Sequence, residues 1–462
     1  MTSIRPFNVS EVVVENNASI TIKNFKSYKD ATLPLSPLTL LIGANASGKS
    51  NAIEAFRFLS WVAGGERLST LKNRVNDSDK VVRGSIKDLA FNSMERFALI
   101  FQNEDIEYEG VFNVSSNSIE LKSEVIRSQE NKIFVLKSLK PPYFDKISKF
   151  LTTDLIDEVN KIAKRNNGLE NFRSSDIDNH ITIHKNKNSD ISEFLMVDKN
   201  IAILDHLHEN KNKAWVDFHD IRKFLQQSFF FDFIPNNMRI DSISDSSLRP
   251  NGSNIAGVLY GICEEEKKKD KLLLLVQSLP EQDITDIKFY KDHRDRIEFA
   301  LVESFGGVDN ERTMDLLSDG TLKVLGIAAA LLSVPEGSTA IIEEIDNSIH
   351  PTRAHEILSL MRQYAEERNI NLLLSTHNPA LMDALPDEAL ADVVFCYRDP
   401  KEGDSKLVRL GDLDDYLGLV AQGTLGDLVT QGIVERFIKH PTTSEQRKQQ
   451  ALSWLNQLQG AD

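Results

Sequence analysis

Short apolar runs alternate with polar and glycine-containing segments in two parts of the chain. Residues 37–43, PLTLLIG, have the length and composition of a buried strand. Residues 51–64, NAIEAFRFLSWVAG, repeat apolar side chains at helical spacing and predict a helix. Two further apolar runs, which begin at Ser338 and Asn371, predict buried strands, and residues 324–334, VLGIAAALLSV, predict an apolar helix.

A glycine-rich segment joins the first predicted strand to the first predicted helix. Its sequence, GANASGKS, fits the pattern G-x-x-x-x-G-K-[ST] through Gly43, Gly48, Lys49 and Ser50. The glycines let backbone N–H groups point at phosphate oxygens, the lysine supplies a positive charge, and the serine hydroxyl can bind Mg²⁺. The order strand, loop, helix also sets a helix N-terminus under the phosphates, so the segment predicts a phosphate cradle and not a simple glycine turn.

Two interpretations fit the start of the apolar helix, DLLSDGTLKVLGIAAALLSV at 315–334. Ser318 and the backbone of Gly320 can present hydrogen-bond donors at the helix N-terminus, which would make a second anion site. A serine ahead of an apolar run is also a common helix cap that involves no ligand. By itself the segment does not separate these alternatives.

Acidic and imidazole side chains follow the two later strands. Paired carboxylates, Glu343 and Glu344, end the strand that begins at Ser338. One carboxylate can hold Mg²⁺, directly or through water, while its neighbour polarises the attacking water. His377 ends the other strand, where its ring would reach a γ-phosphate. A lone histidine there is more often structural, but its place after the other elements favours a catalytic role.

Taken in chain order, these segments resemble an ABC-type ATPase head of the branch that contains RecF, SMC and OLD-type proteins. ITIKNFKSY, followed by LTLLIGANASGKSNAIEAFRF, is similar to the N-terminus of that branch. The resemblance covers residues 20–64 and 231–385 well and residues 386–440 more loosely. The matching motifs are Walker A (Gly43 to Ser50), the signature (Leu317 to Gly320), Walker B (Ile341 to Glu344) and the H-loop (Ser375 to His377).

This resemblance implies an α/β fold, a P-loop ATPase head with a RecA-like parallel-sheet core, an antiparallel β lobe and a helical lobe. It also implies ATP and Mg²⁺ as ligands. The residues expected to bind the nucleotide are Gly43, Asn45, Gly48, Lys49, Ser50 and Asn51, with Ser318 and Gly320 from the signature loop. Ser50 and Glu343 are expected to hold the metal, and Glu344 and His377 to act in catalysis.

Two positions depart from the family pattern. Glu343 stands where the family usually has Asp, once Pro351 is aligned with the family's HP step, and its extra methylene predicts looser Mg²⁺ geometry. The family's Q-loop glutamine has no certain counterpart. Gln102 follows a strand-like run, but a solvent-facing glutamine at a strand end explains it equally well.

A large segment separates the Walker A loop from the signature motif. We expect an ATPase head split between residues 1–115 and 226–462, with an inserted, mainly helical domain at 116–225. Within it, heptad-like spacing at 143–163 predicts either a helix that packs on its own domain or a short interchain coiled coil. Residues 164–190, rich in Asn, Lys, Ser and Asp, predict an exposed, mobile segment.

Composition limits the class of protein. The formal net charge of −15 over 462 residues argues against a wholly basic surface but allows a local basic groove. Cys263 and Cys396 are far apart and predict neither a disulfide framework nor a zinc site. The N-terminus lacks an apolar signal segment, and the longest nearly apolar run, 324–334, is shorter than the roughly 20 residues that span a membrane. We therefore expect a cytoplasmic protein without a membrane partner.

A second chemistry in the same chain is not favoured. His206, His208 and His219 cluster with acidic residues, but their spacing matches no metal motif and fits a solvated helix surface. Asp412 and Asp414 resemble the acidic pair of a TOPRIM nuclease domain, yet little chain follows His377 and no strand directly precedes the pair.

The resemblance therefore implies an ATPase that works through two sandwiched heads, as a homodimer or higher homo-oligomer. Compact ATPases of this kind resemble the sensor ATPases of bacterial anti-phage systems such as PARIS and Septu, which pair with a separate effector protein, usually a nuclease. We expect such a role, with DNA or a phage protein as the trigger. The alternative is a RecF-like DNA repair or replication ATPase, which the acidic composition disfavours. A scaffold with a decayed ATP site is disfavoured because the chemically active motif residues are present.

Overall fold

A six-stranded sheet carries the predicted motifs, in the strand order β10-β14-β15-β3-β16-β17. The first five strands run parallel, and β17 pairs antiparallel with β16. The computed structural model describes residues 18–73, 81–103, 106–128, 131–136, 180–186, 196–197, 216–277, 283–345 and 353–439. The strands of this sheet are β3 (Leu38–Ile42), β10 (Ser228–Phe231), β14 (Thr339–Ile342), β15 (Asn371–Thr376), β16 (Val394–Arg398) and β17 (Ser405–Arg409).

Both faces of the parallel sheet are buried, which explains why its strands are continuously apolar. On β3, Leu40 belongs to one hydrophobic core and Leu41 to the other. On β14, Ile342 and Ile341 divide in the same way. Successive side chains of a strand point to opposite faces, so a strand that separates two cores needs apolar residues at every position.

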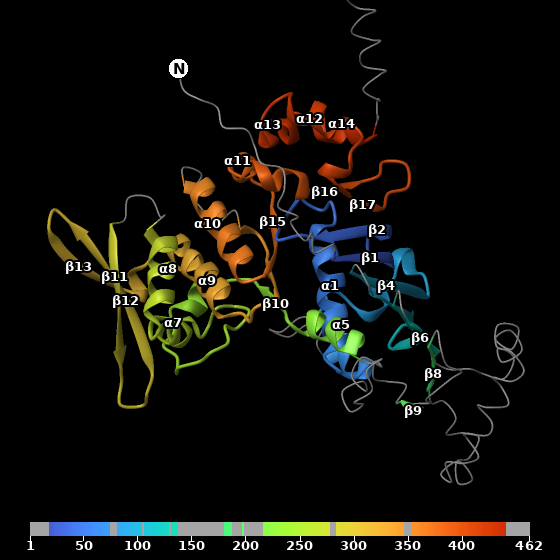
Figure 1. Cartoon of the computed structure of the whole chain (residues 1–462), viewed down its shortest axis with the longest axis horizontal. Coiled ribbons are helices and arrows are strands. Elements are labelled where there is room, and N and C mark those ends of the chain that lie inside the picture. Colours follow the sequence, from blue (N-terminus) through green and yellow to red (C-terminus); the bar gives the residue numbers. More distant parts are fainter. Residues whose placement is uncertain are drawn as a thin grey trace, which may run out of the picture.

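Helices cover the two faces unequally (Figure 1). Helix α1 (Lys49–Ala63) belongs to one core and lies between the parallel sheet and an antiparallel sheet. The other core holds a group of four helices. They are α7 (Ile255–Cys263), α8 (Glu266–Gln277), α9 (Asp319–Ser333) and α10 (Ala354–Glu367).

The antiparallel sheet on the α1 side has eight strands in the order β2-β1-β4-β5-β6-β7-β8-β9. It packs on the helix through aromatic side chains, and the ring centroids of Phe58 on α1 and Phe112 on β5 are 5.0 Å apart. Its strands are β1 (Ala18–Phe25), β2 (Tyr28–Leu35), β4 (Arg96–Gln102), β5 (Ile106–Val114), β6 (Ile119–Ser128), β7 (Asn131–Leu136), β8 (His180–Asn186) and β9 (Met196–Val197).

A three-stranded antiparallel sheet lies beyond the four-helix group, with strand order β11-β12-β13. Its strands are β11 (Ile284–Lys291), β12 (Ile297–Phe305) and β13 (Val308–Thr313). The other α-helices in the described ranges are α5 (Val216–Gln226), α6 (Pro235–Met238), α11 (Pro379–Asp383), α12 (Tyr416–Val420), α13 (Leu425–Thr430) and α14 (Ile433–Lys439). In the described ranges, no helix is both long enough and apolar enough to cross a membrane.

The structure confirms the α/β class and the predicted strand–loop–helix order at the Walker A segment. The predicted buried strands correspond to β3, β14 and β15, and the apolar helix corresponds to α9. The domain boundaries stay a prediction. Of the expected insertion at 116–225, the described part contains β6 to β9, which extend the eight-stranded sheet, and α5. Strand β8 lies within 164–190, and residues 143–163 lie outside the described ranges.

Candidate nucleotide site

The loop between β3 and α1 has the backbone geometry of a phosphate cradle. Gly43 and Gly48 have φ values of 142° and 123°, in the region that favours glycine. A Cβ on Gly43 would lie 2.1 Å from the carbonyl oxygen of Cys396, and one on Gly48 would lie 2.4 Å from Ser405 Oγ. Both glycines are therefore required, by conformation and by close packing, where the loop enters α1 at Lys49.

Hydrogen bonds from two other strands hold this loop in place. The hydroxyl of Tyr28, on β2, donates to the carbonyl of Gly48 across 3.0 Å. The hydroxyl of Ser405, on β17, is buried and donates to the carbonyl of Ser47 across 2.6 Å. No local pattern marks Ser405 as part of the site, because it lies 358 residues from Ser47 in the chain.

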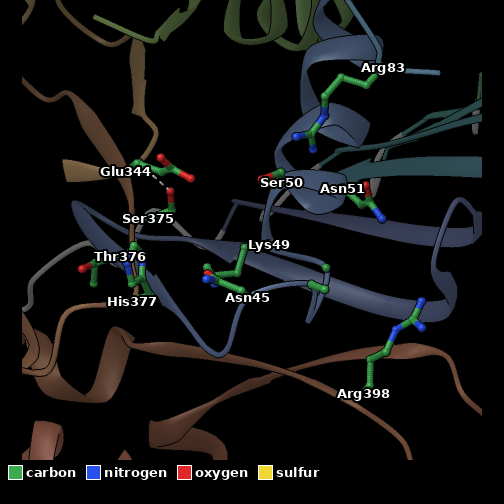
Figure 2. A pocket seen from close by; sticks show the side chains of 12 residues that line it. Asn45, Lys49, Ser50, Asn51, Arg83, Glu344, Ser375, Thr376, His377 and Arg398 are labelled. Carbon is green, nitrogen blue, oxygen red and sulfur yellow. Dashed lines mark hydrogen bonds between the residues drawn. The ribbon is translucent and has the colours of Figure 1, made fainter. Parts of the chain in front are cut away.

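A cavity of about 420 Å³ opens over the loop. Figure 2 shows Lys49 and Asn45 in its middle, with Glu344 and His377 towards one end and Arg398 towards the other. The residues that line it are Asn45, Ala46, Gly48, Lys49, Ser50, Asn51, Arg83, Glu344, Ser375, Thr376, His377 and Arg398. Segments that are distant in the sequence thus meet around one concave surface.

The cavity contains most residues of the predicted site. Those that line it are Asn45, Gly48, Lys49, Ser50, Asn51, Glu344 and His377. Gly43 begins the same loop, and its carbonyl accepts a 2.6 Å hydrogen bond from Lys49 Nζ. Lys49 Nζ also donates to the carbonyl of Ala44 across 3.0 Å, so its positive charge is held over the loop.

The end of β14 presents Glu344 to the cavity through an unusual backbone conformation. Its φ of 51° lies in the left-handed region, which is uncommon for a glutamate and recurs at functional sites. Its N–H donates to Ser375 Oγ, at the end of β15, across 3.1 Å (Figure 2). His377 follows two residues later, so the ends of two adjacent parallel strands bring a carboxylate and an imidazole to one cavity.

Glu343 is oriented differently from its neighbour. Its Oε1 accepts a 2.9 Å hydrogen bond from Arg57 Nη2 on α1, and Glu343 is not among the residues that line the cavity. Burial raises the pKa of the Glu343 carboxyl, and the charge of Arg57 opposes that rise. The predicted metal role of Glu343 stays a prediction.

The side chains at this end of the cavity suit Mg²⁺, which prefers oxygen ligands in octahedral geometry. Ser50 and Glu344 line the cavity, and Glu343 precedes Glu344 in the chain. Among the residues with described positions, no three or more His, Cys, Asp or Glu side chains form a group that could hold a metal alone. Mg²⁺ usually takes several ligands from phosphate and water, with few from the protein.

Ser318, in the signature segment, caps α9. Its Oγ accepts a 3.1 Å hydrogen bond from the N–H of Thr321, so the helix-cap interpretation is confirmed. Ser318 is nevertheless exposed, and neither it nor Gly320 lines the cavity that contains Lys49. The cap and the cradle are therefore separate features of one chain.

An arginine holds the signature loop against the body of the protein. Arg239 Nη2, just after α6, donates to the carbonyl of Leu317 across 2.9 Å and to Asp319 Oδ1 across 2.7 Å. The two acceptors lie on either side of Ser318, so the arginine fixes the backbone around that residue.

Two arginines that no recognised motif contains also line the cavity. Arg83 pairs with Glu54, which in turn pairs with Lys26, and the Glu54 side chain is only 3% exposed. Arg398 ends β16 and is exposed. Neither arginine carries a spacing signal in the sequence, because each reaches the cavity only through the fold.

Other candidate residues lie elsewhere or outside the described ranges. Gln102 is exposed at the end of β4 and does not line the cavity, which matches the solvent-facing alternative. His206 and His208 fall outside the described residues, and His219 lies in α5. Asp412 lies in a short helical segment and accepts a 3.1 Å hydrogen bond from Arg409. Strand β17 ends at Arg409, so the expectation that no strand directly precedes the acidic pair was wrong.

A glycine loop between a parallel strand and a helix, with a carboxylate at the end of another strand, defines a P-loop nucleotide-binding domain of the ATPase class. Residues 38–383 match the family described as "AAA domain, putative AbiEii toxin, Type IV TA system". The match spans well over half of the chain. The protein therefore belongs to this AAA family.

Two characterised proteins share part of the sequence. The methionine import ATP-binding protein MetN 2 of Shouchella clausii is 27% identical over 138 residues, which make up 29% of this chain and 37% of that protein. The chromosome partition protein Smc of Mycobacterium leprae is 35% identical over 99 residues, which make up 20% of this chain and 8% of that protein. The chain thus matches well under two thirds of either relative.

Solved structures of SMC heads are also similar to this chain. The SMC head bound to the C-winged helix domain of ScpA is 12% identical, with a TM-score of 0.42 over 84% of this chain and 96% of that chain. The SMC head domain from Thermotoga maritima is 13% identical, with a TM-score of 0.34 over 85% and 98%. Because both scores are low, the fold assignment rests on the strand order and loop geometry described above.

Proposed function

We propose that the protein binds ATP with Mg²⁺ in the cavity over the Walker A loop and hydrolyses it to ADP and phosphate. One observation carries this proposal: Lys49, Ser50, Glu344 and His377 line the same cavity. Their chemical groups are a cation for phosphate, a hydroxyl for the metal, a carboxylate base and an imidazole. This combination meets the requirements of phosphoryl transfer to water.

The loop residues bind and orient the phosphates. The N–H groups at the start of α1 point towards a bound anion, and the helix dipole adds to their attraction. Lys49 Nζ can exchange its hydrogen bonds to the carbonyls of Gly43 and Ala44 for bonds to phosphate oxygens, which are charge-assisted. Ser50 offers its hydroxyl to Mg²⁺, which, when bound, neutralises phosphate charge and orients the leaving group.

The strand ends supply the groups that act on water. Glu344 accepts a proton from the attacking water as general base, a role that contributes roughly 10²–10⁴-fold to a rate. The bond between its N–H and Ser375 fixes the backbone from which this carboxylate extends. His377 lines the same end of the cavity, and its ring would donate to the phosphoryl group.

The base and ribose of the nucleotide are proposed to occupy a second cavity that adjoins the first. This cavity has a volume of about 410 Å³ and shares Asn51, Arg83 and Arg398 with the phosphate cavity. Lys26 and Ser27, at the turn between β1 and β2, also line it. Its polar lining suits the hydroxyl groups of a ribose and the edge of a base.

The signature loop supports catalysis by a pair of heads. Ser318 is exposed at the N-terminus of α9 and lies outside the cavity of its own chain, where it can face a nucleotide on another subunit once its hydroxyl exchanges its bond with Thr321 Oγ1. Leu316, two residues earlier, is 68% exposed, as expected for a side chain that a partner covers. We therefore propose a homodimer or higher homo-oligomer in which each Ser318 faces the partner's Walker A loop.

The output of this ATPase is proposed to be regulatory. The family description refers to a toxin and a toxin–antitoxin system, which supports a role in bacterial conflict. We propose a cytoplasmic sensor of anti-phage defence that controls a separate nuclease effector and responds to DNA or a phage protein.

A comparison of two lysine variants tests the ATPase proposal. Lys49→Ala should lose ATP binding and hydrolysis, because the loop would then hold several phosphate charges without its cation. Lys267→Ala is the matched control, since Lys267 is exposed on α8, outside both cavities. ATPase activity of Lys49→Ala protein equal to that of wild type would refute the proposal.

A second experiment separates the defence role from a RecF-like role. The purified protein is tested for stimulation of ATP hydrolysis by duplex DNA, and cells that carry it with its neighbouring genes are challenged with phage. Protection that is lost with Lys49→Ala, together with a co-purifying nuclease, is expected. DNA-stimulated hydrolysis without phage protection would favour the RecF-like alternative.

A further inference from the structure

The two adjoining cavities meet at three residues that line both of them. These residues are Asn51, Arg83 and Arg398. With the phosphates in the first cavity and the base and ribose in the second, the α-phosphate lies at this junction, because it joins the phosphate chain to the ribose. A hydrogen-bond donor that is available at the junction would therefore contact the α-phosphate.

Two of the three residues already have partners within the protein. Asn51 Nδ2 donates to Ser27 Oγ across 2.8 Å. Arg83 pairs with the carboxylate of Glu54, whose side chain is only 3% exposed. Part of the donor capacity of both residues is therefore used by the fold itself.

Arg398 is the third residue at the junction, and its donors are available. It is exposed at the end of β16, and no residue in the described ranges makes a hydrogen bond or an ion pair with its guanidinium. Figure 2 shows it at the end of the cavity opposite Glu344 and His377. A guanidinium presents N–H donors in a planar fork that matches two oxygens of one phosphate group.

The backbone of Arg398 is tied to the Walker A loop through the neighbouring strand. Arg398 aligns with Ser405 in the antiparallel pair of β16 and β17. The hydroxyl of Ser405 donates to the carbonyl of Ser47, in the loop, across 2.6 Å. Its N–H donates across 2.7 Å to the carbonyl of Ser27, which lines the second cavity. The strand pair thus anchors Arg398 at the border between the two cavities.

We propose that Arg398 is a binding residue that contacts the α-phosphate of the nucleotide through its guanidinium. The proposal rests on the function proposed above and names the part of the nucleotide that this arginine recognises. ATP and ADP share the α-phosphate, and only ATP has the γ-phosphate that would lie near Glu344 and His377. Arg398 therefore contributes equally to the binding of substrate and product.

Equilibrium binding of two nucleotides to the full-length protein tests this assignment. The ligands are ADP and adenylyl imidodiphosphate, a non-hydrolysable ATP analogue. Arg398→Met removes the donors and keeps an unbranched apolar side chain. It should weaken both ligands by the same factor of about tenfold, near the lower end for a hydrogen bond between charged groups because the site is exposed. Arg398→Lys keeps the charge without the planar fork and should show a smaller loss.

Steady-state hydrolysis of ATP gives an independent readout. Loss of a contact that is equally strong in the ground state and the transition state raises KM and leaves kcat unchanged. Arg398→Met should therefore raise KM by about tenfold, with kcat unchanged. Arg294→Met is the matched control, because Arg294 is also an exposed arginine, in the turn between β11 and β12, outside both cavities. It should change neither constant.

A thiophosphate analogue locates the contact on the nucleotide. In ADPαS, sulphur replaces one oxygen of the α-phosphate and accepts hydrogen bonds poorly. If Arg398 contacts this group, at least one diastereomer of ADPαS should lose less affinity than ADP when Arg398 is replaced by Met. An arginine that contacts the base or the ribose would instead weaken ADP and ADPαS by the same factor. If Arg398→Met does not fold, the same comparison is made with Arg398→Lys.

The outcomes distinguish this inference from the proposed function. Unchanged nucleotide affinity in Arg398→Met, with wild-type protein that binds ADP, would overturn the role of Arg398 alone. A larger loss for the ATP analogue than for ADP would do the same, because it would place the arginine at the γ-phosphate, and so would equal losses for ADP and both diastereomers of ADPαS. Wild-type protein that binds neither ADP nor the ATP analogue would overturn the proposed function and this inference together.

Discussion

The backbone N–H of Glu344 and the hydroxyl of Ser375 share a 3.1 Å hydrogen bond that ties the end of β14 to the end of β15. The bond accompanies a φ of 51° at Glu344, a conformation that costs energy for a residue other than glycine. The carboxylate of Glu344 and the ring of His377 thus belong to one connected strand edge. Changes on this edge should affect chemistry more than nucleotide affinity.

Glu344→Gln should keep ATP bound and slow its hydrolysis strongly. The amide retains the size of the side chain but cannot accept the proton of the attacking water, and such losses run to roughly 10²–10⁴-fold. Single-turnover hydrolysis and ATP affinity are measured on the same preparation. If Glu343→Gln instead binds Mg²⁺-ATP normally and stops hydrolysis, the roles assigned to the two glutamates are reversed.

Ser318→Arg should block hydrolysis while leaving the ATP affinity of a single subunit nearly unchanged. A bulky cation at the exposed cap obstructs the approach of the partner head and does not touch the cradle around Lys49. Mixing Ser318→Arg protein with Lys49→Ala protein provides the decisive measurement. In a head-to-tail pair, one composite site carries both defects and the other carries none.

ATPase activity should therefore return in the mixture, up to about half of wild type if one intact site can fire alone. Subunit exchange is checked with differently tagged chains. If the subunits exchange and ATPase activity does not return, the result counts against a dimer that binds ATP between its two heads, unless both sites must hydrolyse ATP together. A dilute, monomeric protein that hydrolyses ATP at the full rate would rule out a catalytic site shared between two heads.

The pH dependence of stability should report on the burial of Glu343. Burial raises its pKa in the folded chain, so the folded state binds this proton more tightly than the unfolded state. Its contribution to the free energy of unfolding is then fully present below the unfolded pKa of roughly 4.3. That contribution is lost as the pH rises through the higher folded-state pKa.

Wild-type protein should therefore lose stability relative to Glu343→Gln as the pH increases above that point. Urea unfolding of both proteins at a series of pH values measures the difference. A difference that is constant with pH, or that moves in the opposite direction, would show that the environment of Glu343 does not favour its protonated form.

Ser405→Ala should weaken ATP binding by loosening the Walker A loop. The change removes the buried donor to the carbonyl of Ser47, and a buried carbonyl left without a partner costs about 1–3 kcal/mol. Ser338→Ala is the matched control, because Ser338 is also fully buried and donates to a carbonyl, that of Pro335, away from the loop. Equal losses of ATP affinity in both variants would contradict a specific role for Ser405.

The sequence by itself determined the phosphate cradle. The residues of the cradle lie close together in the sequence: Gly43, Gly48, Lys49 and Ser50. Their conformational requirements are local, because two glycines with positive φ connect a buried strand to the N-terminus of a helix. A local requirement of this kind is visible in the residue types and their spacing. The same holds for the acidic pair that follows the β14 strand.

Only the tertiary structure decided which side chains that are distant in the sequence contact one another. Arg57 and Glu343 are 286 residues apart, and Ser47 and Ser405 are 358 apart. The first contact depends on how α1 packs against the end of β14. The second depends on strand order, which places β17 two strands from β3. Apolar strands of similar composition do not specify their neighbours, because burial rewards any arrangement that covers both faces. The partners become identifiable once the sheet has assembled.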